Sequence, residues 1–269
     1  MIAFALAVAA AVRVVSLAPA LTEDLFAIGA GPSVVGVDAF SNRPPAARRL
    51  PRIGAMRSIN GEAVAGLAPT LVVGIPYQAP NLRDLARLGV RTQSLAVDTL
   101  ADDFAAIATL GRLTGHQRDA ARLLASLQRR LDAASRATRG LPQPRAFVVF
   151  GAGPIYTASA KSYVGDLLRI AHVANVAANI DAAFPNVSAE TLEADDPDVL
   201  IVEQGVVLPA APPWSELRAV REHRIVTIQE DDLDRAGPRV ADVVDALIRK
   251  IAPFRQRTAK SSGGGGSKR

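Results

Sequence analysis

Two glutamates occupy the same place in a repeated sequence pattern. Glu62 opens EAVAGLAPTLVVG and Glu190 opens ETLEADDPDVLIV; in each copy a proline lies seven residues further on and an apolar run follows. The spacing predicts, twice, a short helix that ends at the proline and a buried strand after it. A carboxylate in the first helical turn faces the positive end of the helix dipole, which alone could explain each glutamate. The matched pair is equally consistent with two docking points for a partner that carries paired arginines.

No other group of residues suggests catalysis or metal binding. His116, His172 and His223 are far apart in the sequence and the chain has no cysteine, so no histidine or thiolate metal cluster is expected. The GAGP segment, residues 151–154, lacks the spacing of a dinucleotide fingerprint and the ending of a P-loop. We expect it to be a loop that precedes a helix. There is no Gly-x-Ser-x-Gly elbow, so the sequence predicts no catalytic residue, no metal site and no resident cofactor.

The elements around the two glutamates alternate between strand and helix in two similar halves. The pattern of residues 12–98 predicts strands and helices in alternation, with Thr22 as the N-cap of the first helix. Residues 141–254 repeat this order and include an exposed helix at 214–221. Such alternation favours parallel sheets. The sequence predicts an α/β fold with two Rossmann-like lobes, and a ligand usually binds between two such lobes.

A purely helical region, residues 99–140, separates the two lobes. Its second part carries leucines at helical spacing from Leu123 to Leu131, which predicts one helix of about 24 residues and about 36 Å in length. We expect this single long backbone helix to join the two lobes. The alternative is an ordinary packed helix inside one domain.

The charge of the chain lies mainly at its end. The net charge is +5, and five of the basic residues fall in the last 15 positions, which contain no acid. The remaining 26 basic residues balance 26 acidic residues, so a basic footprint for nucleic acid is absent. Residues 255–269 are expected to form a flexible basic Gly/Ser tail. A hydrophobic content of 49% is enough for a folded core, and we expect a monomer.

Residues 1–11, MIAFALAVAAA, form an uncharged run of small apolar residues. They are typical of the hydrophobic region of a signal peptide and are too short to span a bilayer, which takes about 20 residues. We therefore expect a signal-peptide remnant and a periplasmic protein. The alternative is a buried first strand. The absence of cysteine excludes a lipidated N-terminal cysteine in this sequence.

Several segments resemble the periplasmic binding proteins of ABC importers for vitamin B12, haem and ferric siderophores. RVVSLAPALTEDLFAIGAG, VVGVDAFSNRPPAARRLPRIG and the Glu62 repeat are similar to the N-terminal lobe of that family. FGAGPIYTAS, NVSAETLEADDPDVLIV and DLDRAGPRV are similar to the C-terminal lobe, and the resemblance to the vitamin B12-binding members runs from about Arg13 to Phe254. It implies two lobes joined by one rigid helix, with the ligand in the cleft between them.

The resemblance also implies roles for individual residues. The glutamates at the lobe tips of the family, which form salt bridges with permease arginines, correspond to Glu62 and Glu190. The ligand-binding residues it implies are Phe40, Arg43, Met56, Ile75 and Tyr77 in the first lobe and Tyr156, Phe184, Asp231 and Arg235 in the second. Aromatic positions of the B12 binders fall on Met56 and Ile75, and the axial tyrosine of the haem binders falls on Ala55. Arg43, Arg57 and Arg235 either contact ligand carboxylates or phosphate or are solvated surface residues.

From these observations we expect a protein that binds a ligand and releases it without converting it chemically. The chain would bind a metal chelate, a cobalamin or another corrinoid, in the interlobe cleft and deliver it to an ABC transporter permease. Haem or a ferric siderophore is the alternative ligand within the same class. An enzyme that uses the cleft and a cytoplasmic sensor on the same scaffold are the alternatives of another class.

Overall fold

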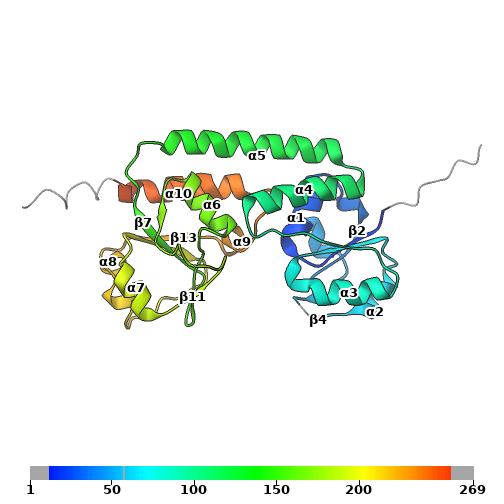
Figure 1. The fold of residues 1–269 in the computed structure, drawn as a ribbon, viewed down its shortest axis with the longest axis horizontal. Coiled ribbons are helices and arrows are strands. Elements are labelled where there is room, and N and C mark those ends of the chain that lie inside the picture. The colour runs from blue at the N-terminus through cyan, green and yellow to red at the C-terminus, as the bar shows by residue number, and fades with distance from the viewer. Residues whose placement is uncertain (1–11, 57, 256–269) are drawn as a thin grey trace, which may run out of the picture. The chain divides into compact units, whose positions relative to one another are not determined.

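The computed structural model describes residues 12–56 and 58–255, which form two compact units (Figure 1). One unit comprises the described residues up to Ala96 together with Phe104–Leu124. The other comprises Val97–Asp103 and the described residues from Ala125 onward. Each unit has its own parallel sheet. The predicted α/β class with two lobes is therefore confirmed, and the helical region between them is divided between the two units.

The first unit is built on a parallel sheet in the order β2-β1-β5-β6. The two central strands, β1 and β5, are buried along their whole length, because the middle strands of a parallel sheet are covered on both faces. Valine, leucine and glycine dominate these segments. The strands are β1 (Val14–Ser16), β2 (Val34–Val37), β5 (Leu71–Gly74) and β6 (Thr92–Ser94), with a separate antiparallel pair, β3 (Gly54–Ala55) and β4 (Ser58–Ile59).

The helices of this unit are α1 (Pro19–Ala27), α2 (Gly61–Gly66) and α3 (Ala79–Arg87), with 3-10 turns at Gly31–Ser33, Pro45–Arg49 and Pro76–Gln78. The prediction that Thr22 caps the first helix is wrong. The helix begins three residues earlier, at Pro19, since proline is favoured at the first helical position. The Thr22 hydroxyl is instead buried, 2.9 Å from Ser16 Oγ and 2.8 Å from Ser41 Oγ.

The second unit repeats the topology of the first. Its parallel sheet has the order β10-β7-β12-β13, so in both sheets the first strand of the unit lies between the second and the third, and the fourth is at the edge. The strands are β7 (Arg145–Val149), β10 (Ala174–Asn175), β12 (Val199–Glu203) and β13 (Ile225–Ile228). The helices are α6 (Tyr163–Ile170), α7 (Ala189–Asp195), α8 (Arg218–Arg221), α9 (Glu230–Leu233) and α10 (Val240–Arg255).

Two local predictions in this unit are wrong. The GAGP segment is not a plain loop: it forms the hairpin of β8 (Gly151–Ala152) and β9 (Ile155–Tyr156), to which β11 (Asn186–Val187) adds a third antiparallel strand. The segment at 214–221 is not an exposed helix. It begins with a 3-10 turn, Trp214–Glu216, and the Trp214 side chain is only 1% exposed in a core with Leu192 and Leu217. The free energy gained by burying the large indole ring exceeds the preference of the neighbouring polar residues for solvent.

The chain first passes between the units at Ala96–Val97, and two long helices contain the two further crossing points. These helices are α4 (Leu100–Thr114) and α5 (Gln117–Thr138). The second is an unbroken helix of 22 residues (Figure 1), close to the expected length. Its residues up to Leu124 belong to the first unit and the rest to the second, so α5 is the long helix that joins the units.

The repeated pattern has the same local structure in both units. Glu62 is the second residue of α2 and Glu190 is the second residue of α7. Each helix is followed by a residue in the left-handed region directly before the proline, Ala68 with φ 43° and Asp196 with φ 31°. Each proline then leads into the third strand of its sheet. The internal repeat read from the sequence is therefore a structural repeat.

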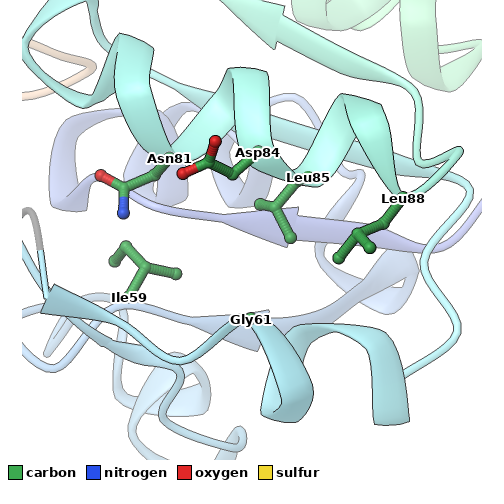
Figure 2. A pocket seen from close by; sticks show the side chains of 6 residues that line it. All are labelled: Ile59, Gly61, Asn81, Asp84, Leu85 and Leu88. Atoms are coloured by element: carbon green, nitrogen blue, oxygen red, sulfur yellow. The ribbon is translucent and has the colours of Figure 1, made fainter.

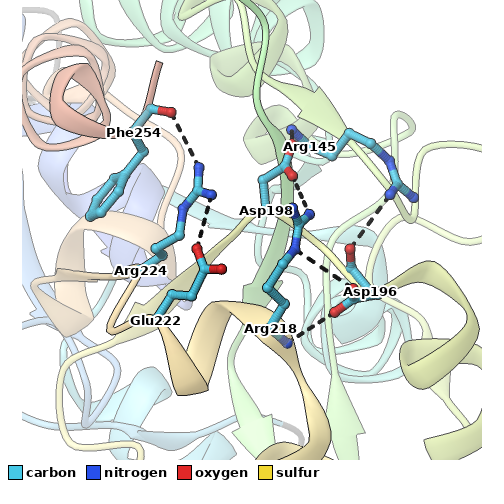
Figure 3. A network of polar contacts seen from close by, with 7 residues as sticks. All are labelled: Arg145, Asp196, Asp198, Arg218, Glu222, Arg224 and Phe254. Atoms are coloured by element: carbon cyan, nitrogen blue, oxygen red, sulfur yellow. Dashed lines mark hydrogen bonds and ion pairs between the residues drawn. The ribbon is translucent and has the colours of Figure 1, made fainter. Parts of the chain in front are cut away.

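A polar network holds the start of β12 in the second unit (Figure 3). Asp198 accepts hydrogen bonds from the Arg218 guanidinium at 2.5 Å and from the Arg145 backbone N–H at 2.9 Å. Asp196 accepts one from the Arg218 backbone N–H at 3.0 Å. These contacts lie at the amino ends of β7 and β12, the edge of the sheet opposite the one where ligands usually bind. We assign them to stability.

The structure changes one predicted boundary at the C-terminus. Arg255, assigned from sequence to the flexible tail, is the last residue of α10 and is 4% exposed. Its guanidinium donates to the carbonyl oxygens of Pro142 at 2.7 Å, His172 at 2.9 Å and Ala171. The predicted signal-peptide remnant and the rest of the tail lie outside the described residues. Among the described helices, none has both the length and the apolar character needed to cross a bilayer.

Candidate functional site

The predicted ligand residues of the first unit lie at the carboxyl edge of its sheet. Phe40 follows the end of β2, and Ile75 and Tyr77 follow the end of β5. Met56 lies between the antiparallel strands β3 and β4. Phe40, Met56 and Tyr77 are 54%, 53% and 48% exposed. Ligands of parallel α/β sheets bind outside the carboxyl ends of the strands, so this edge is the candidate site of the first unit.

A buried carboxylate shapes the loop that presents Phe40. Asp38 is 1% exposed and accepts a hydrogen bond from the Phe40 backbone N–H at 2.9 Å and another from the Ser41 hydroxyl. Arg52 holds the same loop from outside by donating to the carbonyl oxygens of Asp38 at 2.9 Å and Ser41 at 2.7 Å. The loop is thus fixed by its own polar contacts, and the Phe40 ring remains at the surface. Arg43 is half-buried on the same segment.

Gln78 connects three of these segments, and sequence reasoning missed it. The side chain is 2% exposed. Its Nε2 donates to the Leu17 carbonyl at 2.5 Å and to the Met56 carbonyl at 3.2 Å, and its Oε1 accepts from the Ile75 N–H at 3.1 Å. A single buried amide thereby sets the backbone after β1, after β5 and between β3 and β4. No sequence signal indicates this role, since an isolated glutamine is ordinarily a surface residue.

Replacing Gln78 by methionine is expected to loosen the carboxyl edge without removing a ligand-contacting group. The change leaves three backbone groups without their partner, which costs about 1–2 kcal/mol of unfolding free energy. Amide hydrogen exchange at Ile75 should accelerate. The control is Gln93→Met, because the exposed hydrogen bond of the Gln93 side chain within the described residues goes to the carbonyl of the neighbouring Ser94. Equal exchange rates at Ile75 in both variants would contradict the positioning role of Gln78.

The predicted aromatic residues of the second unit lie at the corresponding edge. Tyr156 is on β9, whose hairpin continues from the carboxyl end of β7, where the Phe150 N–H bonds to the Tyr156 carbonyl at 3.0 Å. The Phe184 ring contacts the rings of Phe150 and Tyr163, with centroids 5.9 and 5.7 Å apart. Tyr156 and Phe184 nonetheless remain 45% and 40% exposed. Two further aromatic side chains thus support the Phe184 ring.

The predicted polar residues of this unit form an ion pair with each other. Arg235 Nη2 lies 2.7 Å from Asp231 Oδ1, and the two side chains are 11% and 20% exposed. An anionic ligand group would therefore share Arg235 with Asp231. The neighbouring Tyr163 hydroxyl donates to the Leu233 carbonyl. Burial, and then the nearby charges of Asp234, Glu203 and Asp103, raise the Tyr163 pKa well above its usual value, so the phenol keeps its proton at neutral pH.

In each unit, then, the predicted ligand residues gather at one edge of one sheet. Those of the first unit are on segments tied together by Gln78 and Asp38, and those of the second are on the β8–β9 hairpin and on the segments before β11 and after β13. Arg57 lies outside the described residues. Within residues 12–56 and 58–255, no three histidine, aspartate or glutamate side chains are grouped so that they could hold a metal ion.

Glu62 and Glu190 are presented in the same way by capped helices. Asn60 Oδ1 accepts from the Ala63 N–H at 3.0 Å, and Ser188 Oγ accepts from the Thr191 N–H at 3.2 Å. Both glutamates are exposed. Hydrogen bonds from its own backbone N–H and from Ser188 lower the Glu190 pKa, which keeps this carboxylate charged. Glu62 forms no side-chain hydrogen bond or ion pair with any other described residue.

A pocket of about 220 Å³ lies elsewhere on the first unit, between the start of α2 and one face of α3 (Figure 2). It is lined by Ile59, Gly61, Asn81, Asp84, Leu85 and Leu88. None of the predicted ligand residues lines it. Ligand sites for drug-sized molecules are about 300–1,000 Å³, so this pocket is too small for a corrinoid or a haem. It is close in the chain to Glu62, which directly follows Gly61.

The chain is similar to known binding proteins over most of its length. The sequence model of the periplasmic binding protein family matches residues 14–231. A vitamin B12-binding protein of Photorhabdus laumondii is 29% identical over 252 residues, which cover 90% of this chain and 89% of that protein. An uncharacterized ABC transporter substrate-binding lipoprotein of Bacillus subtilis is 26% identical over 253 residues, covering 90% and 80%. The solved structure of a periplasmic haem-binding protein from Roseiflexus sp. RS-1 superposes with a TM-score of 0.79 at 27% identity, covering 91% and 100%. The chain therefore belongs to the periplasmic binding protein family and has the fold of the solute-binding proteins that serve ABC importers of the B12 and haem type.

Proposed function

We propose that this protein captures a cobalamin or another corrinoid in the periplasm and delivers it to an ABC permease. It acts as a monomer, needs no resident cofactor and converts nothing. The ligand is held by the aromatic and apolar side chains at the carboxyl edges of the two sheets. The similarity to a vitamin B12-binding protein over 90% of the chain supports a corrinoid as the ligand.

One observation carries the proposal. Of the nine large hydrophobic side chains that are exposed among the described residues, five are predicted ligand contacts at the two carboxyl edges: Phe40, Met56, Tyr77, Tyr156 and Phe184. Exposed apolar surface of this extent is typical of binding sites. A ligand with broad apolar faces and a polar periphery would cover these side chains and leave the charged groups around them hydrated. A corrinoid has this character.

The test is a calorimetric titration of the purified protein with cyanocobalamin, haemin and ferrichrome. Saturable one-to-one binding of cyanocobalamin alone is the expected result. Because all three ligands absorb light and quench fluorescence, the heat of binding rather than tryptophan emission decides. Binding of haemin or ferrichrome in place of cyanocobalamin would replace the corrinoid assignment, and heat from none of them would reject it.

Haem is the second candidate, and two tyrosines favour it. Tyr77 and Tyr156 expose their side chains at the two carboxyl edges, and a phenolate is an established axial ligand of ferric haem. The solved haem-binding relative with 27% identity supports the same class of ligand. If haemin binds, its visible spectrum should change on replacing one of these tyrosines by phenylalanine. If neither replacement changes the spectrum, axial coordination of the haem iron by Tyr77 or Tyr156 is ruled out.

Replacing Phe184 or Tyr156 by alanine is expected to weaken binding of the chelate about tenfold, since an aromatic contact contributes about 0.5–1.5 kcal/mol beyond the area it buries. Calorimetry gives the dissociation constants. The matched control is Leu141→Ala, another exposed apolar residue of the same unit, which precedes β7 and so lies toward the opposite end of the strands. Unchanged affinity in the two aromatic variants would show that this edge does not form the ligand wall.

A further inference from the structure

Val207 has the most exposed large hydrophobic side chain among the described residues, at 81%, and it is not one of the predicted ligand contacts. It lies on the segment between β12 and the 3-10 turn that begins at Trp214. This segment leaves the carboxyl edge of the second sheet, the edge from which the hairpin of Tyr156 also continues. A single exposed aliphatic residue is ordinary on a protein surface, so its meaning depends on how the chain presents it.

The backbone is held on both sides of Val207. The side chains of Val206 and Leu208 pack against the buried cluster of the second unit. The Val206 N–H donates to the Glu203 carbonyl at 3.1 Å, and the turn between them contains Gly205 with φ 97°, a conformation that glycine adopts without strain. Because both neighbours of Val207 are anchored on the core, the exposed position of its side chain is set by a defined backbone.

The same buried cluster supports the hairpin that carries Tyr156. Ile155, the neighbour of Tyr156 on β9, belongs to this cluster, and Ala152 on β8 packs against it. Trp214, at the far end of the Val207 segment, donates its indole N–H to the Ala152 carbonyl at 3.4 Å. Val207 and Tyr156 are therefore presented by two segments that pack on one core.

The first unit has a predicted ligand segment at the corresponding place. There the Gln78 N–H donates to the Ile75 carbonyl at 2.9 Å, and the turn that this bond closes presents Tyr77. The bond from Val206 to Glu203 occupies the same position in the second copy of the repeat. The second copy has a glycine where the first has the tyrosine, and its exposed apolar residue is the one that follows Val206.

An aliphatic side chain recognises a different part of a ligand from an aromatic one. An aromatic ring can cover a flat face, whereas valine is small and branched and packs best against other alkyl groups. We propose that Val207 is a further ligand contact of the second unit and that it touches the alkyl substituents at the periphery of a tetrapyrrole chelate. Corrinoids and haem both carry such substituents. The inference rests on the proposed function and names the part of the ligand that this segment recognises.

Replacing Val207 by threonine is the deciding change, because threonine keeps the branched shape but replaces a methyl group by a hydroxyl. In calorimetric titrations with cyanocobalamin and with haemin, the dissociation constant of the chelate that binds should rise about fivefold, the low end of the cost of burying an unpaired hydroxyl. Val207→Leu keeps an apolar side chain and should retain the affinity. The matched control is Ile225→Thr, which changes an exposed aliphatic residue at the amino end of β13 and should leave the affinity unchanged.

NMR gives a direct readout of the contact. The methyl signals of Val207 should shift when the wild type is saturated with the chelate, and those of Ile225 should not. An unchanged dissociation constant in Val207→Thr, or an equal loss of affinity in Val207→Leu, would overturn the proposal. If the affinity is unchanged but uptake into cells falls, Val207 belongs to a surface that contacts the permease instead.

The wild-type titrations separate this inference from the proposed function. A wild type that binds cyanocobalamin or haemin, together with a Val207→Thr variant of equal affinity, would reject only the role of Val207. A wild type that binds ferrichrome alone would reject the tetrapyrrole contact, because the surface of ferrichrome consists largely of peptide and hydroxamate groups. A wild type that binds none of the three would reject the proposed function, and the role of Val207 with it.

Discussion

Replacing Glu62 and Glu190 together by alanine is expected to abolish uptake of the chelate and to leave its binding intact. Both carboxylates are exposed at the first turn of a capped helix, Glu62 on α2 and Glu190 on α7. Neither belongs to the carboxyl edges where the predicted ligand contacts lie. Each would pair with a cation of the permease, and loss of both removes the two charges that orient the complex.

The measurement combines uptake in cells with calorimetry on the purified double variant. A suitable control is Asp119→Ala with Asp132→Ala, which removes the same formal charge from α5 and includes another first-turn acid. Uptake should persist in this control. Normal uptake in the glutamate double variant, or loss of ligand binding in it, would contradict the docking assignment. High salt should also slow uptake by the wild type, because exposed charges are screened.

Replacing Arg255 by methionine is expected to lower the free energy of unfolding by about 3 kcal/mol. The guanidinium is buried at the end of α10, where it satisfies the carbonyl oxygens of Pro142, Ala171 and His172. Methionine fills similar space and leaves these buried acceptors without a donor, and each such loss costs about 1–3 kcal/mol before relaxation. Because α10 packs on α6 and β13, the whole second unit should be affected.

Urea unfolding followed by Trp214 fluorescence measures this loss, since Trp214 is buried in the core of the second unit. The control is Arg249→Met, an exposed position of the same helix. Its unfolding midpoint should match that of the wild type. An equal midpoint for Arg255→Met would mean that the three carbonyl groups find other donors and that the arginine is dispensable for stability.

The helices and strands that were predicted correctly are those whose sequence pattern is contained in a few neighbouring residues. The buried strands that follow the two repeat prolines, Leu71–Gly74 and Val199–Glu203, occur where expected, because short apolar runs rich in β-branched residues favour strands. The helix of α5 also follows its leucine spacing, as the amphipathic period defines which face is buried. The repeated glutamate and proline pattern indicated a duplicated unit, and the two sheets do share one strand order.

The errors occurred where a distant contact outweighs a local preference. Thr22 has the chemistry of an N-cap, yet its hydroxyl is bonded to Ser16 and Ser41. Trp214 stands among residues typical of the surface, but its indole is buried with Leu192 and Leu217. GAGP became a hairpin because β11, more than 30 residues further along the chain, pairs with its second strand. None of these partners can be identified from the spacing of neighbouring residues.

By itself, therefore, the sequence determined the α/β class, the duplication and the types of residue available for a binding site, because composition and periodicity are local properties of the chain. Only the tertiary structure decided how the site is held. It placed Gln78 beneath three loops, paired Arg235 with Asp231, buried Arg255 and formed the pocket between α2 and α3. Each of these features depends on residues that are far apart in sequence and brought together only when the core of each unit is packed.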